Sequence, residues 1–416
     1  MRHSLSDYYK EDTVYFHCFP SGEDSGFFNG VEAWIDALAA GRMLVCAGDK
    51  IKIVLFGAAI NSELLDFLRN ELNVPIAKKE NILFLPVSIA SDIEGAQRNK
   101  LIKDGLKELV DSGKLVMSQP YFDKDFNDIY CISPELIMRL NDKSYLFEYV
   151  PPEFLPKRYH QFDNGEIFEK DNTKLPIPCV IKVAASSGGD GVRVCRTAAD
   201  IDEAKNAFRK MNGIIIVEEF VSSLSNLCVH FGVPFDASRP MEIIGASEQL
   251  TSGSGGFLGG VVNFAKKQPK MEEIKDLMLK RILPRIREEG WYGVGGVDLL
   301  VGTNGGIYVM DFNFRLNATT PYLFQTKNGD IKRPVISFTG TFYGDENAFK
   351  KSIVPFAKMG SPSQILDVIS IIRFKDSYRF NCGMFFGDEE SKAKNARTLL
   401  DVGIHAEVLG TCTSAY

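Results

Sequence analysis

The chain has 416 residues, 45% of them hydrophobic, which predicts a globular protein of two to four domains with a sizeable core. Its formal net charge of −6 at pH 7 argues against general nucleic-acid binding, which needs a basic face. No apolar run approaches the roughly 18 residues of a membrane helix, and the polar start does not resemble a signal peptide, so we expect a cytoplasmic protein that does not bind membranes.

Strands and helices alternate over the first 140 residues. Apolar runs predict buried strands at Lys52–Phe56, Ile82–Val87 and Lys114–Met117, whereas Asn61–Leu72 and Leu101–Val110 have the apolar spacing of helices. Such alternation is typical of a parallel sheet with crossover helices. The turn after the first run lacks the GxGxxG phosphate fingerprint, so no dinucleotide site is expected there.

The middle of the chain begins after the proline-rich segment Tyr149–Pro156. Val180–Val183 predicts a strand that enters a glycine-rich loop. Ile201–Met211 predicts a helix with Asp200 as its N-cap. Ile214–Val217 predicts another buried strand.

A long helix and a hairpin are predicted next. Met271–Glu289 is helical in pattern and is followed by glycine. Gly296–Val301 and Gly306–Asn313 are apolar runs that flank Thr-Asn-Gly at 303–305, a strong hairpin signal.

The last 80 residues mix both kinds of element. Helices are expected at Ser363–Val368 and Glu390–Leu400. Strands are expected near Ile369–Phe374 and Gly403–Leu409.

The hairpin carries a set of oxygen ligands. Asp311 and Asn313 are two residues apart, so their side chains project to the same face of one strand, and Asp298 can reach that face from the partner strand. Two carboxylates and an amide oxygen are ligands that Mg²⁺ prefers. Arg315 continues the alternation and would place a cation beside the metal. A solvated hairpin with surface acids is the alternative, but both strands are too apolar for an exposed ribbon.

A second motif places Lys182 inside an apolar strand, directly before the loop Ser186–Gly191. Backbone N–H groups of such a loop can bind phosphate, and phosphate would compensate the buried lysine. A plain Ser/Gly turn between strands stays open as the alternative. Glu218 and Glu219 end a third apolar strand, which alone could be any edge strand.

In this order and spacing the three motifs resemble the ATP-grasp superfamily of carboxylate–amine ligases over about 141–324. Among its subfamilies the chain is most similar to peptide ligases of secondary metabolism of the pheganomycin peptide ligase type. The resemblance implies a Rossmann-like α/β pre-ATP-grasp domain at 1–140 and a two-lobed ATP-grasp domain at 141–330, with the smaller lobe at about 141–221 and the larger from 222. A small C-terminal α+β region at 331–416 would pack beside the site.

The resemblance also implies residue roles. Lys182 and Arg315 would be catalytic, the latter steadying the acyl phosphate or the substrate carboxylate. Metal ions would be held by Asp298, Asp311 and Asn313. Nucleotide would be bound by Lys143, Val180, Lys182, Ser186, Ser187, Gly188, Gly189, Gly191, Glu218, Glu219, Phe220, Val221 and Met310.

The chain departs from the family pattern in two places. Asp311 stands where glutamate is usual, which shortens its reach towards a second metal ion. The acid that usually holds the ribose is replaced by Ser225 or Asn226. A further glycine-rich loop, Gly253–Gly260, follows Glu248 and could border an acceptor site or be a plain flexible hairpin.

The implied reaction is ATP-dependent joining of a carboxylate to an amine through an acyl phosphate, with release of ADP and phosphate. ATP with Mg²⁺, or Mn²⁺ in its place, would be required. The substrates would be small molecules, an amino acid or peptide among them, and a homodimer stays open. The alternatives are a catalytically silent nucleotide-binding regulator with the same fold, a ligase with a thiol acceptor, and a kinase that stops at phosphorylation.

Overall fold

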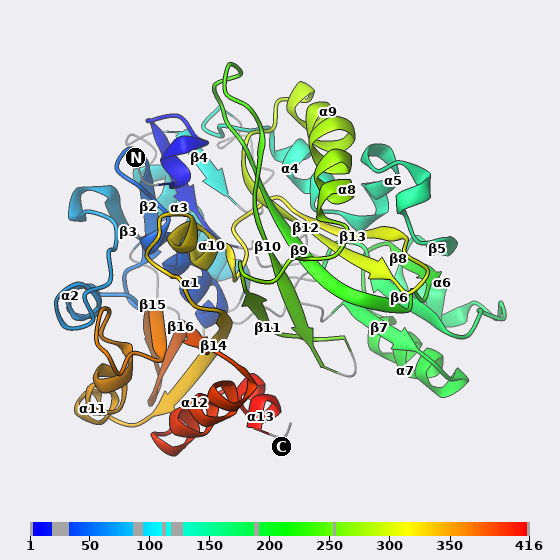
Figure 1. Cartoon of the computed structure of the whole chain (residues 1–416). Coiled ribbons are helices and arrows are strands. Elements are labelled where there is room, and N and C mark those ends of the chain that lie inside the picture. Colours follow the sequence, from blue (N-terminus) through cyan, green and yellow to red (C-terminus); the bar gives the residue numbers. More distant parts are fainter. Residues whose placement is uncertain are drawn as a thin grey trace.

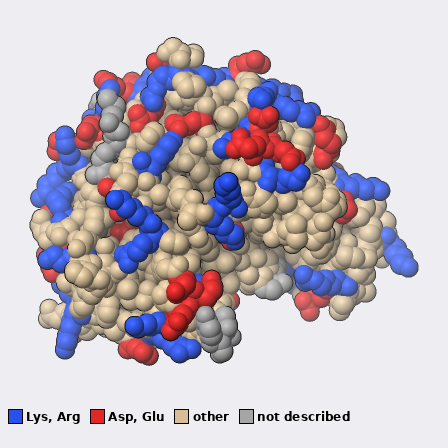
Figure 2. All heavy atoms as spheres, viewed as in Figure 1, with Lys and Arg blue, Asp and Glu red and all other residues tan. Residues whose placement is uncertain are grey.

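The computed structural model describes residues 3–18, 33–85, 95–109, 114–117, 128–186, 191–252 and 255–413. Within these ranges the strands form three sheets (Figure 1). Acidic and basic side chains are interspersed over the face in Figure 2. Among the described helices, none combines the length and the apolar character that a membrane crossing requires.

The N-terminal sheet is parallel, with the strand order β3-β2-β1-β4. Its strands are β1 (Thr13–Phe16), β2 (Lys52–Phe56), β3 (Ile82–Leu85) and β4 (Lys114–Met117). The helices between them are α1 (Ala33–Gly41), α2 (Ser62–Asp66) and α3 (Gly95–Leu109). The predicted parallel α/β arrangement is therefore confirmed. Residues 86 and 87, the end of the predicted Ile82–Val87 strand, lie outside the described residues.

The small lobe is an antiparallel sheet with the order β5-β8-β6-β7. Its strands are β5 (Arg158–Phe162), β6 (Cys179–Val183), β7 (Val192–Cys195) and β8 (Ile215–Glu219). The helices before and within it are α4 (Pro134–Leu140), α5 (Leu146–Tyr149), α6 (Gly165–Lys170) and α7 (Ala198–Phe208).

Helix α7 begins three residues earlier than predicted. Thr197 is its N-cap, and its hydroxyl accepts a hydrogen bond from the Asp200 backbone N–H at 3.2 Å. The Asp200 carboxylate accepts in return from the Thr197 backbone N–H at 2.9 Å. Asp200 as N-cap was therefore wrong, because an acid three residues inside a helix completes a capping box begun by the residue before the helix.

The third sheet has the order β13-β12-β9-β10-β11-β14-β16-β15, and β17 pairs with β14. Its strands are β9 (Ser223–Val233), β10 (Glu242–Thr251), β11 (Phe257–Val262), β12 (Gly293–Gly302), β13 (Ile307–Asn313), β14 (Val335–Tyr343), β15 (Leu366–Phe374), β16 (Ser377–Phe385) and β17 (Ile404–His405). The C-terminal strands thus continue the sheet of the large lobe (Figure 1).

The predicted helix at 271–289 forms as α8 (Met271–Asp276) and α9 (Leu283–Glu288), joined by a π-helical turn at Leu277–Ile282. It ends before Gly290, whose φ of +96° favours glycine. The remaining helices are α10 (Thr320–Lys327), α11 (Glu346–Ala357), α12 (Glu389–Asp401) and α13 (Glu407–Thr413).

Two predicted C-terminal elements were wrong. The Ser363–Val368 helix is absent, since Leu366 and Val368 pair with β16 as the start of β15. The Gly403–Leu409 strand is limited to β17, because α13 begins at Glu407. In both cases a short apolar run fits either kind of element, and long-range pairing decides.

The described residues contain two separate hydrophobic cores. The larger core runs without interruption from the N-terminal sheet through the third sheet. The smaller one lies within the small lobe and includes Phe168, Ile181, Val183 and Val217. The small lobe is therefore packed as a unit of its own.

Candidate active site

Lys182 lies on the face of the small-lobe sheet that is turned away from the small-lobe core. Val180 and Lys182 pair with Glu218 and Ile216 on β8, and directly opposite residues share a face. Val180 and Ile216 are buried, yet they belong to neither hydrophobic core. This face thus combines apolar surface with two charged side chains, as a nucleotide site requires.

A chain of charges crosses this face. Lys182 Nζ donates to Glu218 Oε2 at 2.7 Å, and both side chains are buried. The Arg158 guanidinium lies 3.6 Å from Glu218 Oε1 and donates to the Lys143 and Ser144 carbonyls. Lys182 therefore already has a carboxylate partner, which its place in an apolar strand demands.

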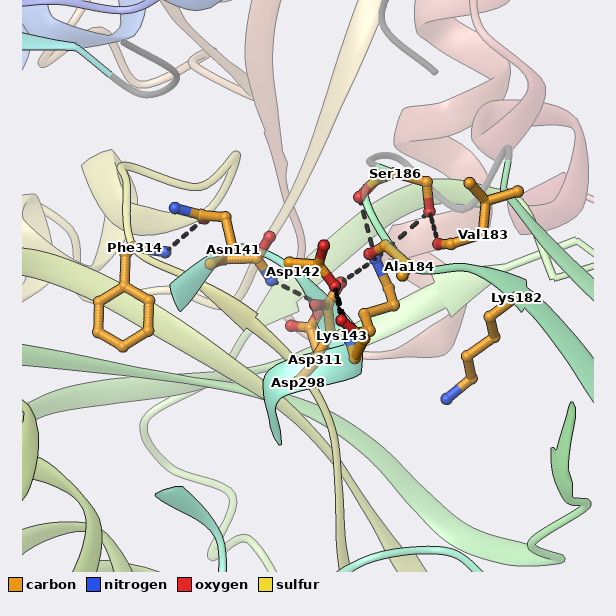
Figure 3. Close-up of polar contacts among 12 residues, drawn as sticks. Asn141, Asp142, Lys143, Lys182, Val183, Ala184, Ser186, Asp298, Asp311 and Phe314 are labelled. Carbon is orange, nitrogen blue, oxygen red and sulfur yellow. Dashed lines mark hydrogen bonds and ion pairs between the residues drawn. The ribbon is translucent and has the colours of Figure 1, made fainter. Parts of the chain in front are cut away.

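Lys143 links the small lobe to the hairpin of the large lobe (Figure 3). It begins a short 3₁₀ helix, Lys143–Tyr145, after α4. Its Nζ lies 3.0 Å from Asp311 Oδ2 and donates to the Ser186 carbonyl at 3.0 Å. Its own backbone N–H donates to the Ala184 carbonyl at 3.1 Å. One buried ammonium thus joins the start of the glycine-rich loop to a candidate metal ligand.

The hairpin brings its three oxygen ligands together. Asp298 on β12 is directly opposite Asp311 on β13, with a bulge beside the pair. Asn313 donates from Nδ2 to Asp298 Oδ2 at 2.9 Å. On its other side Asp298 Oδ1 accepts from Gln249 Nε2 at 2.6 Å.

The electrostatics of this pair suit a divalent cation. Burial, followed by the neighbouring charge of Asp311, raises the pKa of Asp298 to about 6. Two carboxylates held this close repel each other unless a cation or a proton lies between them. Their oxygens and the Asn313 amide are hard ligands, so the residues present fit Mg²⁺. Among the described residues no group of three His, Cys, Asp or Glu side chains offers a competing metal site.

Arg315 lies just beyond the end of β13. The strand stops at Asn313, and the Arg315 backbone N–H turns back to the Asn313 carbonyl at 2.8 Å. The expected strand alternation to Arg315 was therefore wrong. Burial lowers the pKa of Arg315, and the charges of Asp311 and Asp298 counteract this lowering, so the guanidinium still interacts with the candidate metal ligands. Its Nη1 donates to Asn141 Oδ1 at 3.1 Å.

The other predicted nucleotide residues lie at the end of β8, in the connection after it and on β13. Glu219 points to the opposite side of β8, where its carboxylate accepts from the Lys157 backbone N–H at 3.4 Å. The Phe220 ring lies under Arg196, 5.4 Å from the guanidinium. Met310 is the extra residue at the hairpin bulge, and Val221 is half-buried in the connection to β9. The roles given to these residues stay predictions.

The glycine-rich loop is described only at its two ends. Val183 N–H donates to the Gly191 carbonyl at 2.8 Å, and a Cβ on Gly191 would lie 2.3 Å from Ser186 Cβ. The ends therefore touch, which only glycine at 191 allows. Ser187, Gly188 and Gly189 lie outside the described residues.

The second glycine-rich loop joins β10 to β11, and Gly253 lies outside the described residues. Glu248 on β10 lies 2.5 Å from Lys266 Nζ. Whether this loop borders an acceptor stays a prediction.

Three polar residues of the site were missed from the sequence: Asn141, Arg158 and Gln249. Asn141 accepts from both the Phe314 N–H and Arg315, which fixes the turn after the hairpin. Each of the three contacts a residue far away in the sequence. Their local context is an ordinary helix end or strand, so no local pattern distinguishes them.

The model of the family "L-aspartate--L-methionine ligase, ATP grasp" matches residues 156–313, the stretch that contains β5 to β13. Its match spans Lys182, Glu218 and the Asp298–Asp311 hairpin. This chain is an ATP-grasp ligase. The predicted class, an ADP-forming ligase that makes a carbon–nitrogen bond, is confirmed.

Other proteins resemble this ATP-grasp ligase over longer stretches. The formate-dependent phosphoribosylglycinamide formyltransferase of Bacillus subtilis (strain 168) is 25% identical over 304 residues, 72% of this chain and 71% of the relative. A solved ADP complex of N5-carboxyaminoimidazole ribonucleotide synthetase superimposes with a TM-score of 0.59 at 13% identity, covering 96% of this chain and 98% of that chain.

The biotin carboxylase domain of the Hydrogenobacter thermophilus 2-oxoglutarate carboxylase, solved with MgADP, ADP and bicarbonate, has a TM-score of 0.55 at 13% identity. The superposition covers 98% of this chain and 93% of the biotin carboxylase chain. At such identities the two solved structures establish the fold of the ATP-grasp ligase, including its N-terminal parallel sheet.

Proposed function

We propose that this ATP-grasp ligase joins two amino acids, or an amino acid and a peptide, by activating a carboxylate as an acyl phosphate. The convergence of Lys143 and the Asp298–Asp311 pair between the two lobes is the observation that carries the proposal. The matched aspartate–methionine ligase family and the resemblance to peptide ligases of secondary metabolism support amino-acid substrates.

Each charged residue has a task in this chemistry. Lys182 would release Glu218 and bind a nucleotide phosphate. Lys143 would also bind a nucleotide phosphate, from the other side of the site. Val180, Ile216 and the backbone after Glu218 would enclose the adenine. Asp298, Asp311 and Asn313 would hold Mg²⁺, which when bound neutralises charge on the transferred phosphoryl group.

Arg315 would act on the substrate beside the metal ligands. Its guanidinium would bind the developing negative charge when an amine attacks the acyl phosphate. Because Asn141 holds this guanidinium by a hydrogen bond, little reorganisation is needed at that step. None of these tasks requires a covalent enzyme intermediate.

The test is a screen of amino acids in pairs for ADP release, beginning with L-aspartate and L-methionine, followed by mass spectrometry of the product. We expect ADP and phosphate to appear together with a dipeptide. Pyrophosphate released in step with product would contradict the mechanism. ADP release that needs no amine would indicate phosphorylation alone.

One relative suggests a second candidate for the same screen. Because a formate-dependent formyltransferase aligns over 71% of its length, formate with a phosphoribosylglycinamide acceptor belongs among the tested pairs. ADP formation with that pair and with no amino-acid pair would replace the dipeptide proposal.

A further inference from the structure

Within the described part of the chain, one half-buried guanidinium without a carboxylate partner lies where the N-terminal part meets the far end of the third sheet. Arg42 opens the 3₁₀ helix Arg42–Val45, which follows α1 directly. Its Nε is buried and makes no hydrogen bond. Its Nη2 makes one long contact, 3.5 Å, with Asn381 Oδ1 on β16. No ion pair to Arg42 is formed within the described residues.

The place of this arginine is fixed by close packing. A Cβ on Gly41 would lie 2.5 Å from Ser370 Cβ, so the chain presses on β15 just before Arg42. Asn381 donates from Nδ2 to the Leu38 carbonyl at 2.7 Å and to Ser370 Oγ at 3.0 Å. These bonds turn its Oδ1 towards Arg42. In Figure 1, α1 lies beside β15 and β16 at this junction, and α10 contacts the 3₁₀ helix that Arg42 opens.

The charges of Arg42 and of Arg315, the arginine of the candidate active site, act on each other. Burial, with the charge of Arg315 as a further cause, lowers the pKa of Arg42 to about 10. His17 lies just after β1. Burial, followed by the charges of Arg42 and Arg315, lowers the pKa of His17 well below its usual value. Both arginines therefore act on His17.

Among the residues that the structure describes, the charges of this region leave one cation unmatched. Arg315 faces the carboxylates of Asp298 and Asp311, whereas Arg42 faces Asn381 and a second arginine. Arg42 is half-buried, and a guanidinium partly removed from water beside a like charge is costly unless an anion binds to it. A single carboxylate balances one guanidinium and matches its planar fork, whereas a doubly charged phosphate would leave excess negative charge.

We propose that Arg42, with Asn381 beside it, binds a carboxylate of an amino-acid substrate that is retained through the reaction, and so selects for substrates that carry it. This proposal rests on the proposed function. The carboxylate that becomes the acyl phosphate loses its charge, so it is a different group. The retained one is either the second carboxylate of an acidic donor or the α-carboxylate of the acceptor, which stays free in the product.

The experiment compares each substrate with its amide in the wild type, Arg42→Gln and Arg42→Lys. Arg379→Gln is the matched control, because Arg379 also has a buried Nε without a partner but stacks on Trp34 at 3.8 Å. The pairs are L-aspartate against L-asparagine and isoasparagine, and L-methionine against L-methioninamide. The readout is the ratio of kcat/KM for acid to amide, and retained ATP-induced thermal stabilisation shows that each variant is folded.

We expect the wild type and Arg379→Gln to prefer the acid form of one substrate by about 10- to 100-fold, the range of a charged hydrogen-bonded pair. Arg42→Gln should reduce that preference to about threefold or less, and Arg42→Lys should keep part of it. The substrate that loses its preference is the source of the carboxylate. Unchanged preference for both acids in a folded Arg42→Gln variant would overturn the proposal.

Binding without turnover separates this proposal from the proposed function. If no pair releases ADP from the wild type, the ligase reaction with these substrates fails, and the thermal shift induced by each acid and amide tests Arg42 directly. A shift induced by an acid, absent with its amide and lost in Arg42→Gln, would support the carboxylate site. Absence of any such shift in the wild type would overturn it.

Discussion

At the scale of single residues, Asp311 is the carboxylate whose removal tests the metal centre most directly. Asp311→Asn keeps the shape of the side chain and removes the charge that faces Lys143 and Asp298. We expect turnover to fall by about a hundredfold or more, the size of one lost transition-state charge contact. Steady-state kinetics with saturating Mg²⁺ would measure the loss.

The control is Asp276→Asn, which breaks an exposed ion pair between Asp276, the last residue of α8, and Lys280. This change should leave turnover within about twofold, since exposed ion pairs contribute little. Near-normal turnover in a folded Asp311→Asn variant would mean that the hairpin carboxylates are structural.

Lys182 tests nucleotide binding in the same way. Lys182→Met keeps the aliphatic stem but cannot bind a phosphate, so the thermal stabilisation by ATP should disappear while the apo protein stays folded. Differential scanning fluorimetry with and without ATP measures this. Lys327→Met, which removes a partly buried lysine paired with Glu242, is the control and should retain the ATP effect. Retained stabilisation in Lys182→Met would place the phosphates elsewhere.

The residues of the site divide into those that a local pattern can predict and those that it cannot. Asp298 and Asp311 were placed opposite each other because a Thr-Asn-Gly turn sets the register of the hairpin. Asn141 and Gln249 contact the same centre from segments about 170 and 50 residues away. Their contacts depend on how the lobes and sheets pack, which no short motif encodes.

At the scale of elements, the two ends of the Ser186–Gly191 loop must touch for the strand pair β6 and β7 to close. Gly191→Ala would place a methyl group 2.3 Å from Ser186 Cβ, so the ends must separate. Because the Lys143 ammonium donates to Ser186, this separation would also disturb the lysine. We expect weaker ATP binding and a larger share of ATP hydrolysed without product, since water then reaches the acyl phosphate.

Paired assays of ADP and product measure that share. Gly213→Ala is the matched control in the same lobe, because a Cβ there meets nothing within 4 Å. Tight coupling of ADP to product in Gly191→Ala would show that the contact between the loop ends is not needed to keep water from the acyl phosphate.

Elements that end at a residue typical of an element end, such as glycine after a helix, were predicted well. Apolar runs without such a residue were not. Gly290 ended the long helix as expected, since its positive φ favours glycine. The run at Leu366–Phe374 was divided between a helix and a strand because what fixes it as β15 is pairing with β16 and packing against other elements, α1 among them. Burial on both faces removes the alternation that would have marked a strand.

At the scale of the whole molecule, one buried acid makes the stability of the fold depend on pH. Both carboxylate oxygens of Asp367 on β15 are buried and lack hydrogen-bond partners within the described chain. Burial raises the pKa of Asp367 from 3.8 to about 7. Between about pH 4 and pH 7, Asp367 therefore keeps its proton in the folded state, whereas in the unfolded chain it has already lost it.

The pKa of Asp367 is higher in the folded state than in the unfolded chain. Proton binding by Asp367 therefore stabilises the fold, and this stabilisation is complete below about pH 4 and is lost as the pH rises through 7. At about 1.4 kcal/mol per pH unit, the loss reaches roughly 4 kcal/mol. Asp367→Asn should consequently unfold at a higher temperature than the wild type at pH 8 and vary less with pH. The exposed Asp376→Asn is the control, and an equal pH dependence in Asp367→Asn and wild type would contradict the assignment.

The third sheet also determines how the protein can be divided. The family match ends at Asn313, yet the sheet continues from β11 through β14 and β16 to β15, whose outer side α1 of the N-terminal part contacts. A fragment cut near residue 330 would leave the backbone N–H and C=O groups of β11 that pair with β14 open to other chains. Such an apolar open edge recruits further strands and aggregates. The C-terminal strands thus cover the edge of β11 and prevent polymerisation through it. The catalytic lobes are therefore not separable from these strands.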